Sequence, residues 1–170
     1  MRIELVDSGD LKAVGKALKQ QADGKELRKQ LAKELRSEIR PMVQAVKAAW
    51  LAAPSRGHAT SSRSRRSEPN LRTLLAKATA GQVRFTGKEA GVRVRTDGRK
   101  LPDGMKALGG YAEGIRRRVW RHPVFGDTET WVQQRAFPRF YRTVQPDESR
   151  ARQACIDAVD TVFDKIARAR

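Results

Sequence analysis

The first fifty residues carry apolar side chains at the spacing of amphipathic helices. Leu11, Val14 and Leu18 recur three and four residues apart, and Asp23-Gly24 then interrupts the pattern. A second stripe follows, made of Leu27, Leu31, Leu35, Ile39, Met42, Val43, Val46 and Trp50. This spacing predicts helix over residues 10–53, with residues 25–53 forming one helix about 43 Å long.

Pro41 lies inside the second stripe. Proline has no backbone N–H group, and its ring crowds the preceding helical turn. We therefore expect the long N-terminal helix to kink or break near residues 37–40. A helix of this length in a chain of 170 residues favours a scaffolding role.

Further along, alternating apolar and basic residues predict strands at 82–86 and 91–96. Val83, Phe85, Val92 and Val94 alternate with Arg84, Arg93 and Arg95, so we expect one buried face and one basic face. Residues 87–90 suit a hairpin turn between these strands. Residues 129–134 are a third strand candidate, and residues 71–78 and 108–111 are expected to form short helices.

A last helix is expected to begin at Pro146, a residue favoured at the first helical position, with Asp147 and Glu148 in its first turn. Its predicted apolar face comprises Cys155, Ile156, Val159, Val162, Phe163 and Ile166. The predicted class is α+β, with the long N-terminal helix and the C-terminal helix packed on a small antiparallel β-sheet. We expect residues 1–170 to form a single domain.

The chain is strongly basic, with a net charge of +17, which favours a polyanion or an acidic protein surface as a partner. Residues 54–70 are rich in Ser, Gly, Pro and Arg, so we expect a flexible basic loop at 55–70. The candidates for contact with DNA phosphates or an acidic partner are Arg63, Arg65, Arg66, Arg116, Arg117 and Arg118. The alternative is that these arginines are solvated or pair with acidic neighbours in an oligomer.

Residues 118–142 interleave aromatic and basic side chains, a combination that is enriched at protein interfaces. We assign Trp120 and Trp131 to the core. Pro123 and Pro138 restrict the chain beside the other aromatics, which lowers the entropy lost on docking. The predicted partner-interface residues are Phe125, Phe137, Phe140 and Tyr141. The alternative is that all of these aromatics cover the sheet and the last helix.

Bond-making chemistry finds little support in the sequence. His58, His122 and Cys155 do not have the spacing of a metal site, and Cys155 fits a small core residue. The segment from Gly81 to Lys88 has one residue too many for a phosphate-binding loop, and Glu89 follows where Ser or Thr is needed. The acidic residues of the loops have no evident catalytic partners. We therefore expect no catalytic residues, no metal, no cofactor and no enzymatic activity.

A single cysteine excludes an intramolecular disulfide. The N-terminal residues show no targeting pattern, and no apolar run approaches the roughly 20 residues needed to span a bilayer. We expect a soluble protein that is made in a cytoplasm and has no membrane partner.

Several segments, in their order along the chain, resemble the small tail-component family of long-tailed bacteriophages, whose members are also called neck or tail-completion proteins. The resemblance is carried by Arg121-His122-Pro123-Val124-Phe125-Gly126, Trp131-Val132 and Phe137-Pro138-Arg139-Phe140. Upstream it includes Asp10-Leu11, residues 25–31, the helix around Pro41, Ala53-Pro54, Pro69-Asn70-Leu71-Arg72 and Gly91-Val92-Arg93-Val94. It covers most of the chain and departs from the family at the Ser/Arg-rich insert 55–68, which we expect to order only on assembly.

The resemblance implies a structural virion protein that joins the phage head to the tail. It also implies assembly as a homo-oligomeric ring of six copies around the DNA channel, in contact with the neighbouring head–tail connector and tail tube proteins. The protein would be located at the head–tail junction of the virion after synthesis in the host bacterial cytoplasm. Two alternatives remain: a tail terminator that caps the tail tube, and a free accessory protein that binds double-stranded DNA without reading its sequence.

Overall fold

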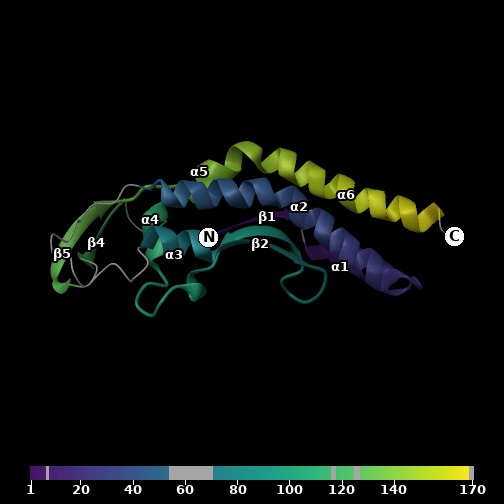
Figure 1. Cartoon of the computed structure of the whole chain (residues 1–170), viewed down its shortest axis with the longest axis horizontal. Helices are drawn as coiled ribbons and strands as arrows, with labels where there is room; N and C mark the ends of the chain where they lie inside the picture. The colour runs from purple at the N-terminus through teal and green to yellow at the C-terminus, as the bar shows by residue number, and fades with distance from the viewer. Residues whose placement is uncertain (7, 54–70, 116–117, 125–126, 169–170) are drawn as a thin grey trace. The chain divides into compact units, whose positions relative to one another are not determined.

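The computed structural model describes residues 1–6, 8–53, 71–115, 118–124 and 127–168 (Figure 1). The chain divides into two compact units. The first, here called the sheet unit, contains Arg2–Ala45, Ala80–Arg95 and Val144–Arg170. The second, here called the hairpin unit, contains Met1, Val46–Thr79 and Thr96–Thr143. Helices together with two small sheets give the α+β class that the sequence predicts.

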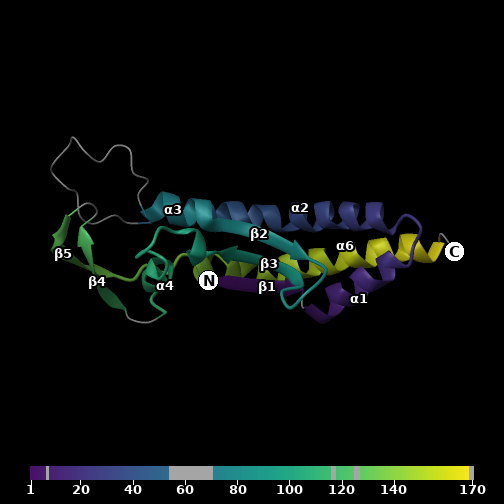
Figure 2. The same cartoon turned by 90° about the horizontal axis from the view of Figure 1, so that it is seen from below.

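The sheet unit is built on three strands in the order β1-β3-β2 (Figure 2). These are β1 (Arg2–Val6), β2 (Thr79–Arg84) and β3 (Gly91–Thr96). Strand β3 matches its predicted range, β2 begins three residues before the predicted 82–86, and β1 was not predicted. The turn between β2 and β3 uses Gly87 at a φ of 83°, and the Ala90 N–H group donates to the Gly87 carbonyl oxygen.

Strand β3 lies in the middle of this sheet, and this position overturns the expectation that its arginines form an exposed basic face. Arg93 is buried, because its guanidinium pairs with the Glu4 carboxylate of β1 at 2.8 Å. The same group donates to the carbonyl oxygens of Glu89 and Ala90. The charge is therefore compensated inside the unit, as a buried cation requires.

Helices α1 (Ser8–Lys19) and α2 (Gly24–Leu51) follow the two apolar stripes, and they are separated where Asp23-Gly24 predicts an interruption. Helix α2 continues through Pro41, so the predicted break does not occur, although its ribbon bends along its length (Figure 1). Pro41 is exposed. The missing hydrogen bond is best tolerated on the solvent side, where helical bonds lengthen as a helix curves.

A 3-10 turn at Gln145–Asp147 leads into the last helix, α6 (Glu148–Arg168), which packs against β1. The turn holds Pro146 near its start, so the α-helix itself begins two residues later than expected. The buried residues of α6 are Ala151, Cys155, Val159, Val162 and Ile166. Ile156 and Phe163, which were assigned to the same apolar face, are each 38% exposed.

The hairpin unit contains α3 (Leu71–Ala78), the 3-10 turn Gly98–Lys100, α4 (Leu108–Glu113), β4 (Val119–Val124), β5 (Asp127–Arg135) and α5 (Phe140–Val144). Its core includes Trp50, whose indole N–H group donates to the Thr96 hydroxyl at 3.3 Å. The Thr79 and Thr96 hydroxyls lie 2.8 Å apart and are hydrogen bonded. The short helices at 71–78 and 108–113 agree with the sequence, whereas β4 was not predicted.

Candidate interaction surface

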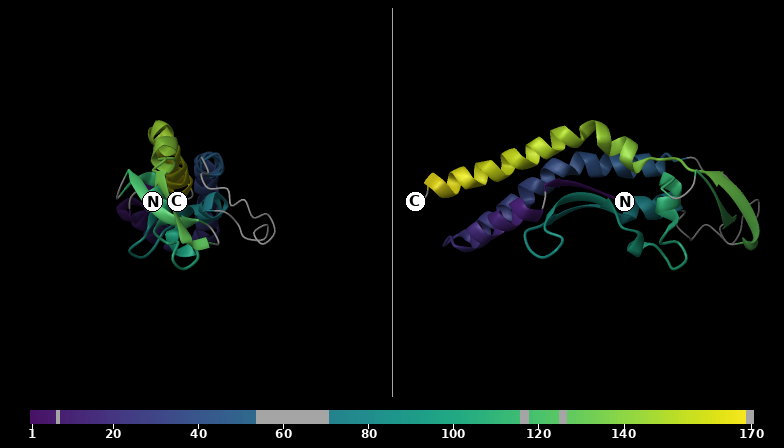
Figure 3. Two further views of the ribbon diagram at one scale, coloured as in Figure 1. Left: turned by 90° about the vertical axis from the view of Figure 1, so that its left-hand side faces the viewer. Right: turned by 180° about the vertical axis from the view of Figure 1, so that it is seen from behind.

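Strands β4 and β5 form an antiparallel two-stranded sheet (Figure 3). Val119 pairs with Arg135 and Arg121 with Gln133, and Trp131 lies two residues before Gln133 on β5. Because successive residues of a strand point to opposite faces, these five residues share one face of the hairpin. Trp120, Val132 and Gln134 belong to the other face.

The first of these faces is exposed, and we call it the Trp131 face. It comprises Val119, Arg121, Trp131, Gln133 and Arg135. Trp131 is 52% exposed, so its assignment to the core is wrong. The alternation of β5 carries the signal that was missed, since Trp131 shares its face with the polar residues Glu129 and Gln133.

The opposite face is anchored by Trp120, which is buried as predicted. Its indole ring stacks on Tyr111 of α4, with ring centroids 5.8 Å apart and planes inclined by 20°. Such a pair adds to the hydrophobic gain from burial alone. The hairpin is therefore held to α4 by one face only, which leaves the Trp131 face to solvent.

Phe140 was expected at a partner interface, and the structure contradicts this. The side chain is fully buried in the core of the hairpin unit, in an edge-to-face contact with Tyr141. The buried Glu113 carboxylate accepts the backbone N–H groups of Arg139 and Phe140, both at 2.5 Å. This carboxylate caps the start of α5 and draws Phe140 inward.

Phe137 and Tyr141 are half-buried. The Phe137 N–H group donates to the Ala112 carbonyl oxygen at 2.8 Å, which fixes the chain that leaves β5. Both residues keep part of their surface accessible, and their interface role stays a prediction. Phe125, the remaining predicted interface residue, lies outside the described residues.

The Trp131 face carries positive charge. Arg121 and Arg135, which belong to it, are exposed and make no ion pair within the part of the chain that the structure describes. Of the arginines predicted to contact DNA or an acidic partner, only Arg118 lies within the described residues, where it is exposed and directly precedes β4. The others, Arg63, Arg65, Arg66, Arg116 and Arg117, lie outside the described residues.

Cys155 is a buried free thiol in the sheet unit. Burial, together with the nearby Glu38 carboxylate, raises the pKa of this thiol from 9.0 to about 11. Such a thiol is a poor nucleophile, because the thiolate is the reactive form. Within the described residues there is no cluster of three or more His, Cys, Asp or Glu side chains arranged to hold a metal ion.

None of the described helices combines the length and the apolarity that a membrane span needs. Comparison of the whole chain with protein-family models, with curated proteins and with solved structures found no match.

Proposed function

We propose that this protein is a structural subunit of the joint between the head and the tail of a long-tailed bacteriophage, acting by contact with neighbouring proteins and not by catalysis. The observation that carries the proposal is the Trp131 face, a solvent-exposed hairpin surface that combines one large aromatic ring with arginines. The order of the motifs along the sequence, which resembles that of neck and tail-completion proteins, points to the same role.

Trp and Arg are the residues most enriched among those that dominate binding energy, and each does so when a partner covers it. A two-stranded hairpin is also marginally stable alone and gains from a surface that buries its free face. The Trp131 face thus has the chemistry of a protein docking surface.

A ring of subunits is the arrangement that such a joint requires, because the DNA passes through its centre. Head-to-tail contacts that close by rotation generate rings. Positive charge on the lumen side would attract the DNA, and positive charge on other sides would dock on acidic neighbours. The net charge of +17 suits both surroundings.

The proposal is tested by supplying variants from a plasmid to a phage whose own copy of this reading frame is disrupted. Trp131→Ala should lower the yield of infectious particles by on the order of tenfold or more, since loss of a central aromatic anchor costs at least about that factor in affinity. The matched control is Leu51→Ala, because Leu51 is also 52% exposed and belongs to α2, not to β4 or β5.

A full yield of infectious particles with Trp131→Ala would contradict a role of the Trp131 face in virion assembly. A second candidate function, DNA binding by the free protein, is favoured by Arg121 and Arg135 of the Trp131 face, which are exposed and make no ion pair within the described residues. It predicts that the isolated protein binds duplexes of unrelated sequence and that affinity falls steeply with salt. In that case Arg121→Ala combined with Arg135→Ala would weaken DNA binding, with virion assembly unchanged.

A further inference from the structure

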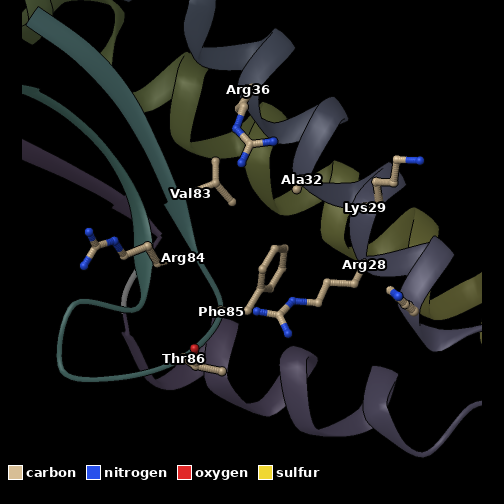
Figure 4. Close-up of a pocket in the computed structure, with 9 residues that line it drawn as sticks. Arg28, Lys29, Ala32, Arg36, Val83, Arg84, Phe85 and Thr86 are labelled. Atoms are coloured by element: carbon tan, nitrogen blue, oxygen red, sulfur yellow. The ribbon is translucent and has the colours of Figure 1, made fainter.

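A basic groove lies between α2 and the end of β2 in the sheet unit (Figure 4). Its volume is about 680 Å³. The cations along its rim are Lys25, Arg28, Lys29 and Arg36 from α2 and Arg84 from β2. Its remaining lining comes from Ala32, Val83, Phe85 and Thr86, so apart from the Thr86 hydroxyl the groove is apolar between its charged edges.

Only part of this charge is compensated. Arg84 pairs with Glu89 at 2.8 Å, and Lys29 approaches Glu26 at 3.8 Å. Lys25 and Arg36 are exposed and have no ion pair within the described ranges. The groove therefore presents unpaired positive charge to whatever occupies it.

Arg28 places a positive charge next to the apolar part of the groove, so an occupant must match both. Its guanidinium lies over the Phe85 ring, 5.1 Å from the ring centroid, which is a cation–π contact. The stacked guanidinium keeps its N–H groups available, beside apolar side chains from both walls. An occupant that matches this groove brings carboxylates to the rim and apolar side chains to the floor. The convex backbone of a DNA duplex would meet the rim cations and leave the apolar floor uncovered.

One surface of the same chain has this chemistry. Residues 153–164 of α6 contain three aspartates and no lysine or arginine, in a chain whose net charge is +17. Asp157, Asp160 and Asp164 are exposed, and Ile156 and Phe163 are each 38% exposed. At about 100° per residue these five side chains lie within one arc of the helix, beside the arc that is buried. We call this the acidic face of α6.

We propose that the acidic face of α6 in one copy of this chain docks in the basic groove of a neighbouring copy. Aspartates would pair with the rim cations, and Ile156 and Phe163 would cover the apolar floor. From residue 156 to residue 164 the helix advances about 12 Å, and from Lys25 to Arg36 the groove wall advances about 16 Å, so the groove is long enough for this segment. Figure 4 shows the groove side chains on α2 and on the end of β2 beside it, with the α6 ribbon running behind α2.

Two different surfaces are used in this contact, so it is head-to-tail and can be repeated from copy to copy. The inference rests on the proposed function in one respect: a closed ring is the product that a head–tail joint needs. The contact itself requires only the two faces, and it is tested on the purified full-length protein without any phage.

The test uses a zero-length carbodiimide, which couples a carboxylate to a lysine amine in direct contact, followed by mass spectrometry of the cross-linked dimer. We expect links from Lys25 or Lys29 to Asp157, Asp160 or Asp164.

In sedimentation experiments, Asp160→Lys with Asp164→Lys should weaken self-association at least about tenfold, and so should Lys25→Glu with Arg36→Glu. The control Lys12→Glu with Lys16→Glu makes the same change in charge on α1, outside the groove, and should leave association unchanged.

Mixing the two interface variants provides the decisive result. Each copy then meets a partner of opposite charge on both of its surfaces, so association should return to the wild-type level. The proposal is overturned if the mixture stays dissociated or if no cross-link joins the two faces. It is also overturned if the groove variant binds DNA more weakly than the wild type but self-associates as strongly. Because circular dichroism of each variant reports folding separately, a misfolded variant is not mistaken for a broken interface. Failure here would leave the role of the Trp131 face standing, and loss of that role would leave this contact standing.

Discussion

At the scale of single residues, the Glu113 carboxylate links α4 to the start of α5 within the hairpin unit. It lies at the end of α4 and accepts hydrogen bonds from backbone N–H groups at the start of α5. The first N–H groups of a helix have no partner within the helix, and a buried one without an acceptor is costly. Glu113 therefore stabilises the position of Phe140 in the core.

We predict that Glu113→Ala lowers the free energy of unfolding by about 1–3 kcal/mol, because it leaves these buried donors without an acceptor. Glu113→Gln keeps one acceptor oxygen and should lose less than half as much. Urea unfolding gives the magnitudes, and faster hydrogen exchange at the Phe140 amide would locate the effect. Equal stability of Glu113→Ala and the wild type would show that the cap contributes nothing.

The raised pKa of Cys155 makes the stability of the fold decrease at alkaline pH. Its folded-state pKa of about 11 lies above its ordinary value of 9.0, so the folded protein holds this proton at pH values where the unfolded chain releases it. The contribution to stability is therefore complete below pH 9 and is lost as the pH rises from 9 to 11.

We predict that the native thiol reacts with a disulfide reagent far more slowly than the thiol of the urea-unfolded chain when both are measured below pH 9. The rate in the native protein should rise with pH toward a midpoint of about 11. Rapid, complete labelling of the folded protein at neutral pH would contradict the burial of this residue.

At the scale of the elements, the turn between α1 and α2 is set by backbone contact. A Cβ atom at Gly24 would overlap with the carbonyl oxygen of Leu18, which belongs to the end of α1. Only glycine lets the two helices approach so closely at this point. The sequence marks this turn through Asp23-Gly24, which interrupts two otherwise continuous apolar stripes.

We predict that Gly24→Ala destabilises the protein, although alanine is favoured over glycine in a helix by about 1 kcal/mol. Gly110→Ala in α4 is the matched control, because its Cβ atom would meet no atom within 4 Å. The control should be neutral or slightly stabilising. Thermal unfolding of both variants decides the matter, and a stabilised Gly24→Ala would mean that the overlap is relieved without cost.

The three longest helices, α1, α2 and α6, were predictable from the sequence because their apolar stripes are long and regular, whereas α5 was not predicted. The strands were predictable only in part. β1 has five residues, too few for a clear period, and β4 has Pro123 at a position where a proline argues against a paired strand. Missing β1 had a further consequence, since Arg93 reads as an exposed residue unless the strand that carries Glu4 is known.

At the scale of the whole molecule, composition predicts the kind of partner and not the surface that meets it. The charge of +17 points to acidic neighbours or to DNA without locating them. Trp131 was placed in the core and Phe140 at an interface, whereas the structure exposes Trp131 and buries Phe140. Size and aromaticity are the same for a core residue and a docking residue. For Phe140 the burial depends on the hydrogen bonds of Glu113, a residue more than twenty positions away in sequence.

The measurement that tests the central claim most directly is electron microscopy of a lysate from a phage in which this reading frame is disrupted. A head–tail joining role predicts DNA-filled heads and finished tails that lie unjoined, with joined particles restored by the intact chain supplied from a plasmid. Overlong or absent tails would identify a tail terminator or tube role instead. Normal joined virions would contradict the structural role and favour the free DNA-binding protein.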